Sequence, residues 1–130
     1  MLNIGDSLEI KDTVTPEMLA VYMGSGDLEV LATPAVVALM ENAASTLAKK
    51  GVGDDFTTVG TMINIEHVSP TPVAAEIRAK AVLKESDGRF FKFDIEAYDE
   101  KGLIAKGEHT RVSVNSGKFQ KKADEKFSEV

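Results

Sequence analysis

The sequence has 130 residues, no cysteine, 43% hydrophobic and 28% charged residues, and a formal net charge of -6. This length fits one domain, and the absence of cysteine excludes disulfides, thiolate metal sites and a cysteine nucleophile. The acidic balance argues against a nucleic-acid partner, and no apolar run is long enough to span a membrane. We expect one domain without a nucleic-acid or membrane partner, and a cytoplasmic location because no secretory signal is recognisable.

The first thirty residues predict short elements. Residues 8–14 alternate weakly, as in a short strand. Thr15 and Pro16 resemble a helix N-cap followed by proline at the first helical position. We therefore expect a brief helical turn over residues 18–23, which the Gly-Ser-Gly-Asp run at 24–27 ends.

The strongest helix pattern covers residues 34–50. Thr33 and Pro34 repeat the cap signature, and Gly51 ends the run. Because these residues are apolar almost all the way round, the pattern is typical of a buried helix. We expect the rest of the chain to wrap it.

Four strand-like runs follow, over residues 57–66, 73–84, 89–98 and 103–114. The short joins at 86–88 and 99–102 are rich in turn residues and predict an antiparallel meander for the last three. Alternation places the apolar residues of the second and third runs on one face, whereas the last run alternates poorly. The simplest assembly is an α+β fold with a five-stranded antiparallel sheet around one long central helix.

Glu41 interrupts the apolar pattern of the long helix. It lies on one stripe with Pro34, Ala38 and Ser45, small side chains along which another backbone could approach closely. A carboxylate there loses hydration, which costs several kcal/mol unless it is hydrogen-bonded. A catalytic role and a structural role, as a partly exposed or ion-paired group, both remain open.

Three further residues could take part in catalysis or binding, and each also has a structural explanation. His67 ends a strand and has a pKa range suited to proton transfer, but a structural histidine fits as well, as it does for His109. Thr33 fits an N-cap, and the same helix start offers free N–H groups to a developing oxyanion or a substrate carbonyl. Gly60 inside a strand indicates a bulge or a ligand close to the backbone. Two histidines without cysteine argue against zinc, and we predict no metal.

Three segments, LATPAVVALMENAA, TVGTMINIEHVSPTPV and GEHTRVSV, resemble the hotdog thioesterases of the fluoroacetyl-CoA thioesterase-like family over nearly the whole chain. Thr33 precedes Glu41 by 8 positions, Glu41 precedes His67 by 26, and Gly60 precedes the histidine by seven. This spacing is similar to that of the family's Thr, Glu and His catalytic set. The resemblance implies a hotdog fold, a homodimer with sheets joined edge to edge, active sites between the subunits, and no cofactor beyond the coenzyme A of the substrate.

From this resemblance we predict one hotdog thioesterase-like domain over residues 1–117 and a polar basic tail over 118–130. The expected reaction is hydrolysis of a small acyl-CoA to a free acid and coenzyme A. Thr33 would position the reacting groups, Glu41 would act as nucleophile or base, and His67 would orient water or carry a proton. Gly60 and Pro34 would contact the substrate.

The acyl group is expected to differ from fluoroacetyl. The fluoroacetyl-specific member carries bulky aromatic residues ahead of the threonine, where this chain has Gly-Ser-Gly-Asp at 24–27. We therefore expect this chain to accept a different or broader range of acyl groups. Because a fold does not fix a function, a non-catalytic acyl-CoA-binding module and a hotdog hydratase or dehydratase remain alternatives.

Overall fold

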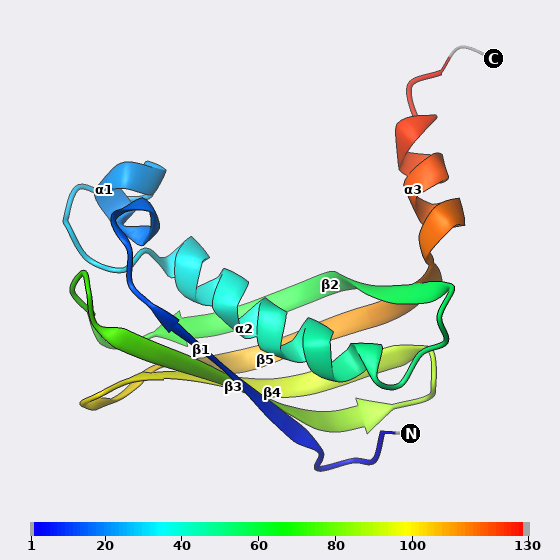
Figure 1. Cartoon of the computed structure of the whole chain (residues 1–130), viewed down its shortest axis with the longest axis horizontal. Coiled ribbons are helices and arrows are strands. Elements are labelled where there is room, and N and C mark those ends of the chain that lie inside the picture. The colour runs from blue at the N-terminus through cyan, green and yellow to red at the C-terminus, as the bar shows by residue number, and fades with distance from the viewer. Residues whose placement is uncertain (1, 129–130) are drawn as a thin grey trace.

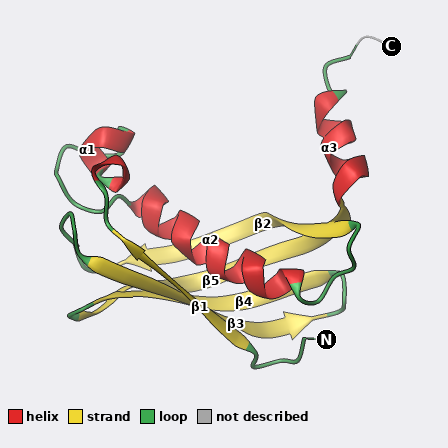
Figure 2. Cartoon of the chain, in the orientation of Figure 1, coloured by secondary structure: helices red, strands yellow, loops and turns green. Residues whose placement is uncertain are grey.

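The computed structural model describes residues 2–128. Its elements are β1 (Ser7–Thr13), a 3-10 turn (Pro16–Met18), α1 (Ala20–Met23), α2 (Thr33–Lys49), β2 (Phe56–His67), β3 (Glu76–Ser86), β4 (Phe90–Asp99), β5 (Gly102–Asn115) and α3 (Ser116–Asp124). The five strands form one antiparallel sheet in the order β1-β3-β4-β5-β2, and α2 crosses one face of it (Figure 1, Figure 2). The predicted α+β fold and the β3-β4-β5 meander are confirmed.

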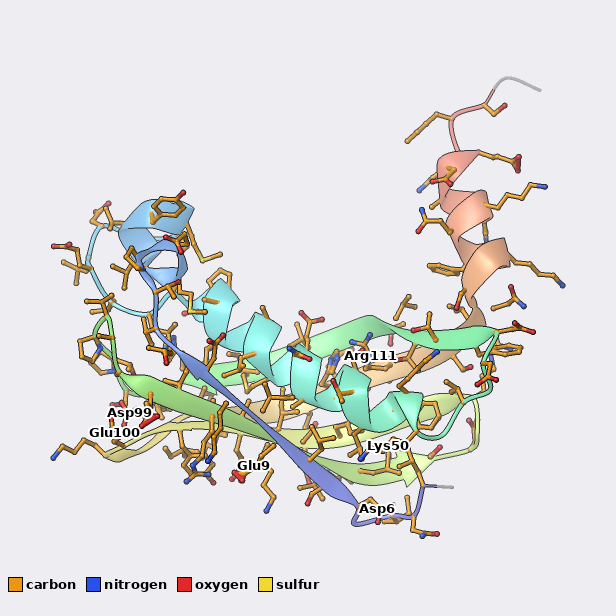
Figure 3. All side chains as sticks on the ribbon, in the orientation of Figure 1. Asp6, Glu9, Lys50, Asp99, Glu100 and Arg111 are labelled. Carbon is orange, nitrogen blue, oxygen red and sulfur yellow. The ribbon has the colours of Figure 1, made fainter. Side chains whose placement is uncertain are left out.

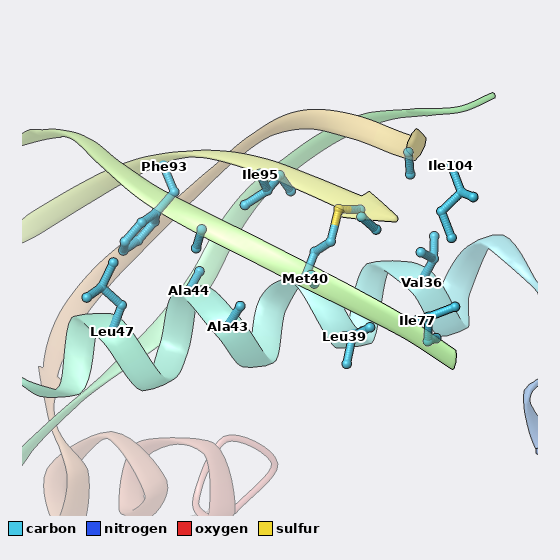
Figure 4. Packing of buried hydrophobic residues seen from close by; sticks show 14 of the residues in the cluster. Val36, Leu39, Met40, Ala43, Ala44, Leu47, Ile77, Phe93, Ile95 and Ile104 are labelled. Carbon is cyan, nitrogen blue, oxygen red and sulfur yellow. The ribbon is translucent and has the colours of Figure 1, made fainter. Parts of the chain in front are cut away.

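Alternation in the middle of the sheet builds the core. Every second residue of β3 and β4 is buried: Ile77, Ala79, Ala81, Leu83, Phe91, Phe93, Ile95 and Ala97. Ala43, Ala44 and Ala48 of α2 are fully buried, and such small side chains let the helix lie close to the strands. Figure 4 shows Leu47 and Phe93 filling the space beside them. Each large side chain buried here contributes about 1.5–3 kcal/mol.

α2 is buried on one face only. Its buried residues are Val36, Leu39, Met40, Ala43, Ala44, Leu47 and Ala48. Pro34, Ala38 and Asn42 lie on the other side and are exposed. The sheet covers one face of the helix, as expected for a sheet around a central helix, and leaves the small side chains on the opposite face open.

β2 lies at one edge of the sheet and, within the described residues, pairs only with β5. Met62 and Ile63 on this strand are 38% and 40% exposed. The pairing register shifts between Gly60 and Met62, as at a β-bulge. A long edge strand with free backbone groups and exposed apolar side chains is suited to pairing with another strand.

The predicted basic tail begins as a helix, which was not expected. Asn115 caps α3, since its side-chain oxygen accepts from the Lys118 N–H at 3.0 Å. The polar composition of α3 lacks the apolar stripe from which helices are predicted. Of the tail, residues 129–130 lie outside the described residues. Among residues 2–128, no helix is both long and apolar enough to cross a membrane.

Candidate active site

Thr33 and His67 meet where α2 begins and β2 ends. Thr33 Oγ1 lies 2.8 Å from His67 Nδ1. The predicted N-cap role of Thr33 is wrong, because Ala32 occupies the cap position and no side chain of the described residues caps it. The hydroxyl binds the imidazole instead, which fixes the orientation of the ring.

His67 presents its second ring nitrogen without a partner. Nε2 is buried and makes no hydrogen bond within the described residues. Burial lowers the pKa of His67 below 6.5, because desolvation disfavours the imidazolium form. The ring borders a hollow of about 320 Å³ that Thr33, Ser25 and Ser69 also line. A neutral imidazole thus lies beside an open space, and its Nε2 has no hydrogen-bond partner among the described residues.

Glu41 lies midway along α2, opposite Gly60 of β2. A Cβ atom on Gly60 would stand 3.1 Å from Glu41 Oε2 and 3.0 Å from His109 Cε1. Any side chain at position 60 would therefore crowd the carboxylate. The bulge next to Gly60 shifts the alternation of β2 by one residue, so that Gly60 and His67, an odd number of positions apart, both face α2.

A buried polar network lies beside Glu41, and its arginine was not among the predicted site residues. His109 Nδ1 donates to the Met62 carbonyl at 2.8 Å, so Nε2 accepts from Arg111 Nη1 at 3.1 Å. Arg111 also donates to the hydroxyl and the carbonyl oxygen of Thr58, at 2.8 Å each. Figure 3 shows Arg111 close to the middle of α2. These inward polar residues explain why the last strand alternates poorly in the sequence.

The network places positive charge next to Glu41. Burial lowers the pKa of His109, and the charge of Arg111 lowers it further, whereas the Met62 carbonyl and Glu41 oppose the change. Burial also lowers the pKa of Arg111, against the attraction of Glu41, but a guanidinium stays protonated in proteins. His109 is therefore a neutral acceptor that helps hold a cationic Arg111 against the carboxylate. Both residues lie in the GEHTRVSV segment, which carries part of the family resemblance.

One chain does not bring the three predicted catalytic residues together. Thr33 and Glu41 are eight residues apart on α2, which is about 12 Å along the helix axis. Thr33 and His67 form one group, and Glu41 lies in another. Pro34, predicted to contact the substrate, is exposed in the first turn of α2 beside the first group. Residues 2–128 contain no group of three His, Cys, Asp or Glu side chains able to hold a metal ion.

A five-stranded antiparallel sheet crossed by one long helix defines the class as the hotdog fold. The family described as fluoroacetyl-CoA-specific thioesterase matches residues 14–117, and the chain belongs to this family. The family name describes hydrolases of thioesters.

Individual relatives agree with this assignment. The chain is 30% identical over 98 residues to the fluoroacetyl-CoA thioesterase of Streptantibioticus cattleyicolor, covering 75% of this chain and 70% of that protein. A solved structure of the fluoroacetyl-CoA thioesterase FlK has a TM-score of 0.90 at 24% identity, covering 97% of this chain and 98% of that one. A thioesterase superfamily member from Thermus thermophilus has a TM-score of 0.88 at 22% identity, covering 98% and 97%. The two structural similarities show the fold.

Proposed function

We propose that this chain hydrolyses a small acyl-CoA thioester to a free acid and coenzyme A. The proposal depends on one observation. The Glu41 carboxylate, next to the backbone of Gly60, and the His67 imidazole, whose Nε2 has no hydrogen-bond partner among the described residues, lie on the same face of β2. Thioester hydrolysis uses such a pair, a base or nucleophile and a proton carrier. The thioesterase family to which the chain belongs supports the same reaction.

We place each active site between two copies of the chain. A homodimer with a two-fold axis pairs the exposed β2 edges antiparallel. Because the bulge adds one residue between Gly60 and His67, a two-fold axis at Asn64 sets the bulge at Gly60 and Thr61 opposite His67 of the partner subunit. Glu41 then faces the partner's His67 and the threonine bound to it. Such pairing also covers the exposed Met62 and Ile63 and the open face of α2.

In this arrangement the thioester carbonyl lies over Gly60, next to Glu41. The carboxylate either attacks the carbonyl carbon, giving an anhydride that water then cleaves, or takes a proton from the water that attacks. Both routes consume one water and end in one carboxylic acid and one thiol. His67 of the partner subunit relays a proton from that water to the departing thiolate and ends neutral again. Thr33 positions that imidazole, and Arg111 lies beside the Glu41 carboxylate, which attracts its charge.

The acyl group belongs in the hollow beside His67. Ser25, from the Gly-Ser-Gly-Asp segment, lines this hollow together with Val30 and Val68. Because small side chains stand where the fluoroacetyl-specific member carries aromatic residues, we propose a short acyl group other than fluoroacetyl.

The test is thiol release from a panel of short acyl-CoAs by the wild-type protein and by Glu41→Gln. The amide keeps the size of the side chain and removes its charge, so turnover should fall about 10²-fold or more while the fold persists. Full activity in Glu41→Gln would overturn the assignment of the carboxylate. Binding of acyl-CoA without thiol release would indicate a non-catalytic binding module. A change in enoyl absorbance without thiol release would indicate a hydratase or dehydratase.

A further inference from the structure

A second and larger hollow lies where β2 begins and β5 ends, under α3. Its volume is about 540 Å³. Six side chains carry the argument: Phe56, Arg89, Ser113, Lys118, Phe119 and Lys122. We call this space the α3 hollow. It is separate from the groups assigned to hydrolysis.

The α3 hollow is cationic although the chain as a whole carries a net charge of -6. Arg89, Lys118 and Lys122 line it, and no carboxylate does among the described residues. Lys118 and Lys122 are four residues apart on α3 and share one face of the helix. The nearby Asp87 carboxylate already accepts the N–H groups of Arg89 and Phe90, at 2.9 and 2.7 Å. Because Asp87 also attracts the charge of Arg89, Lys118 and Lys122 are the two cations without an acidic partner among the described lining residues.

Two aromatic rings line the same space. Phe56 and Phe119 are 41% and 43% exposed. Local contacts hold α3 above them, because Asn115 caps the helix and the Ser116 N–H donates to the Asp55 carbonyl at 2.9 Å. A phosphorylated nucleoside is bound by two features together: cations that contact its phosphates and aromatic faces on which its base stacks. The α3 hollow has both.

We propose that the α3 hollow binds the phosphorylated adenosine end of coenzyme A, an inference that rests on the function proposed above. Phe56, Thr58 and Gly60 alternate onto one face of β2, and the Thr58 side chain accepts from Arg111, which lies beside Glu41. The hollow and the carboxylate are therefore on the same face. Four residues of strand separate Phe56 from Gly60, about 13 Å. Thr58 and Arg111 are buried between the two, so we place an extended pantetheine arm along the free edge of β2, where it spans that distance and joins the nucleotide to the thioester.

The experiment compares wild type, the Lys118→Ala/Lys122→Ala variant and the control Lys121→Ala. Lys121 is on the same helix but does not line the hollow, and alanine preserves helix propensity in each case. Calorimetric titration with adenosine 3′,5′-bisphosphate tests nucleotide binding without any hydrolysis. We expect the Kd to rise on the order of tenfold in the paired variant and to stay unchanged in Lys121→Ala, and added salt to weaken wild-type binding.

Kinetics separate this inference from the proposed hydrolysis. With acyl-CoA, the paired variant should show a higher KM at unchanged kcat, and with the matching acyl-pantetheine, which lacks the nucleotide, it should match wild type. Lysine-dependent nucleotide binding without thiol release would support the hollow and overturn the hydrolase. Thiol release with an unchanged KM in the paired variant, or no nucleotide binding by wild type, would overturn the hollow.

Discussion

Thr33 Oγ1 and His67 Nδ1 lie 2.8 Å apart although 34 positions separate the two residues in the chain. This bond joins the first residue of α2 to the last residue of β2. The orientation of the imidazole therefore depends on a hydroxyl that the sequence pattern assigns to helix capping.

Thr33→Val should lower kcat for thioester hydrolysis by roughly ten- to a hundredfold, because it keeps the shape of the side chain and removes the hydroxyl. Thr33→Ser keeps the hydroxyl and should restore most of the activity. Steady-state thiol release measures both variants, with circular dichroism as the check on folding. Equal rates for the valine and serine variants would contradict a positioning role.

Mixed dimers test whether each active site is shared between subunits. Glu41→Gln and His67→Ala should both be inactive as homodimers. In a mixed dimer, one site collects both substitutions and the other collects none, so an equal mixture of the variants should recover about a quarter of wild-type activity. The mixture is made by unfolding and refolding the two variants together. If each site belonged to a single chain, no activity would return.

The buried His109 predicts a loss of stability on acidification. Its pKa in the folded chain lies below 6.5, so the unfolded chain takes up the proton more readily. The stability from the neutral ring is complete above pH 6.5 and is lost as the pH falls through the folded pKa. His109→Asn should reduce the free energy of unfolding at pH 7.5 by about 1–3 kcal/mol, since the bond from Arg111 and the stacking on Phe93 are lost.

Urea denaturation of wild type and His109→Asn at pH 7.5, 6.5 and 5.5 measures this effect. The difference between the two proteins should narrow as the pH falls, because only wild type must protonate His109. His67 is present in both proteins, so its contribution to the pH dependence cancels from the difference in unfolding free energy. A constant difference across this range would show that His109 is not buried in its neutral form.

Gly107→Ala should be among the most destabilising small substitutions in the sheet. A Cβ there would overlap the Asn64 carbonyl oxygen and stand 2.7 Å from the Cα of Ile65, both backbone atoms of β2. β2 would have to move away from β5, at a cost of more than about 3 kcal/mol. Gly53→Ala is the matched control, since its Cβ would meet only Phe56 Cδ1 at 4.0 Å. Thermal unfolding should separate the two variants by many degrees, and similar melting temperatures would contradict the close approach.

The sequence predicts most of the secondary structure correctly because those signals are local. Apolar alternation identifies β3 and β4, and the run ending at Gly51 identifies α2. The α3 helix was missed because its polar residues carry no apolar stripe, and Arg111 was missed because one arginine in a poorly alternating strand has no local mark of burial. The catalytic roles of Thr33, Glu41 and His67 come from spacing shared with a family and stay predictions.

The sequence by itself determined the fold class and the family, since periodicity, turn residues and the offsets between Thr33, Glu41 and His67 are all readable along the chain. Only the tertiary structure decided which groups meet. The bulge beside Gly60 turns that residue to the same face as His67, and the Thr33 hydroxyl bonds an imidazole rather than its own helix. The reason is that a hydrogen bond or a close approach between strands depends on separation in space, which no pattern of neighbouring residues encodes.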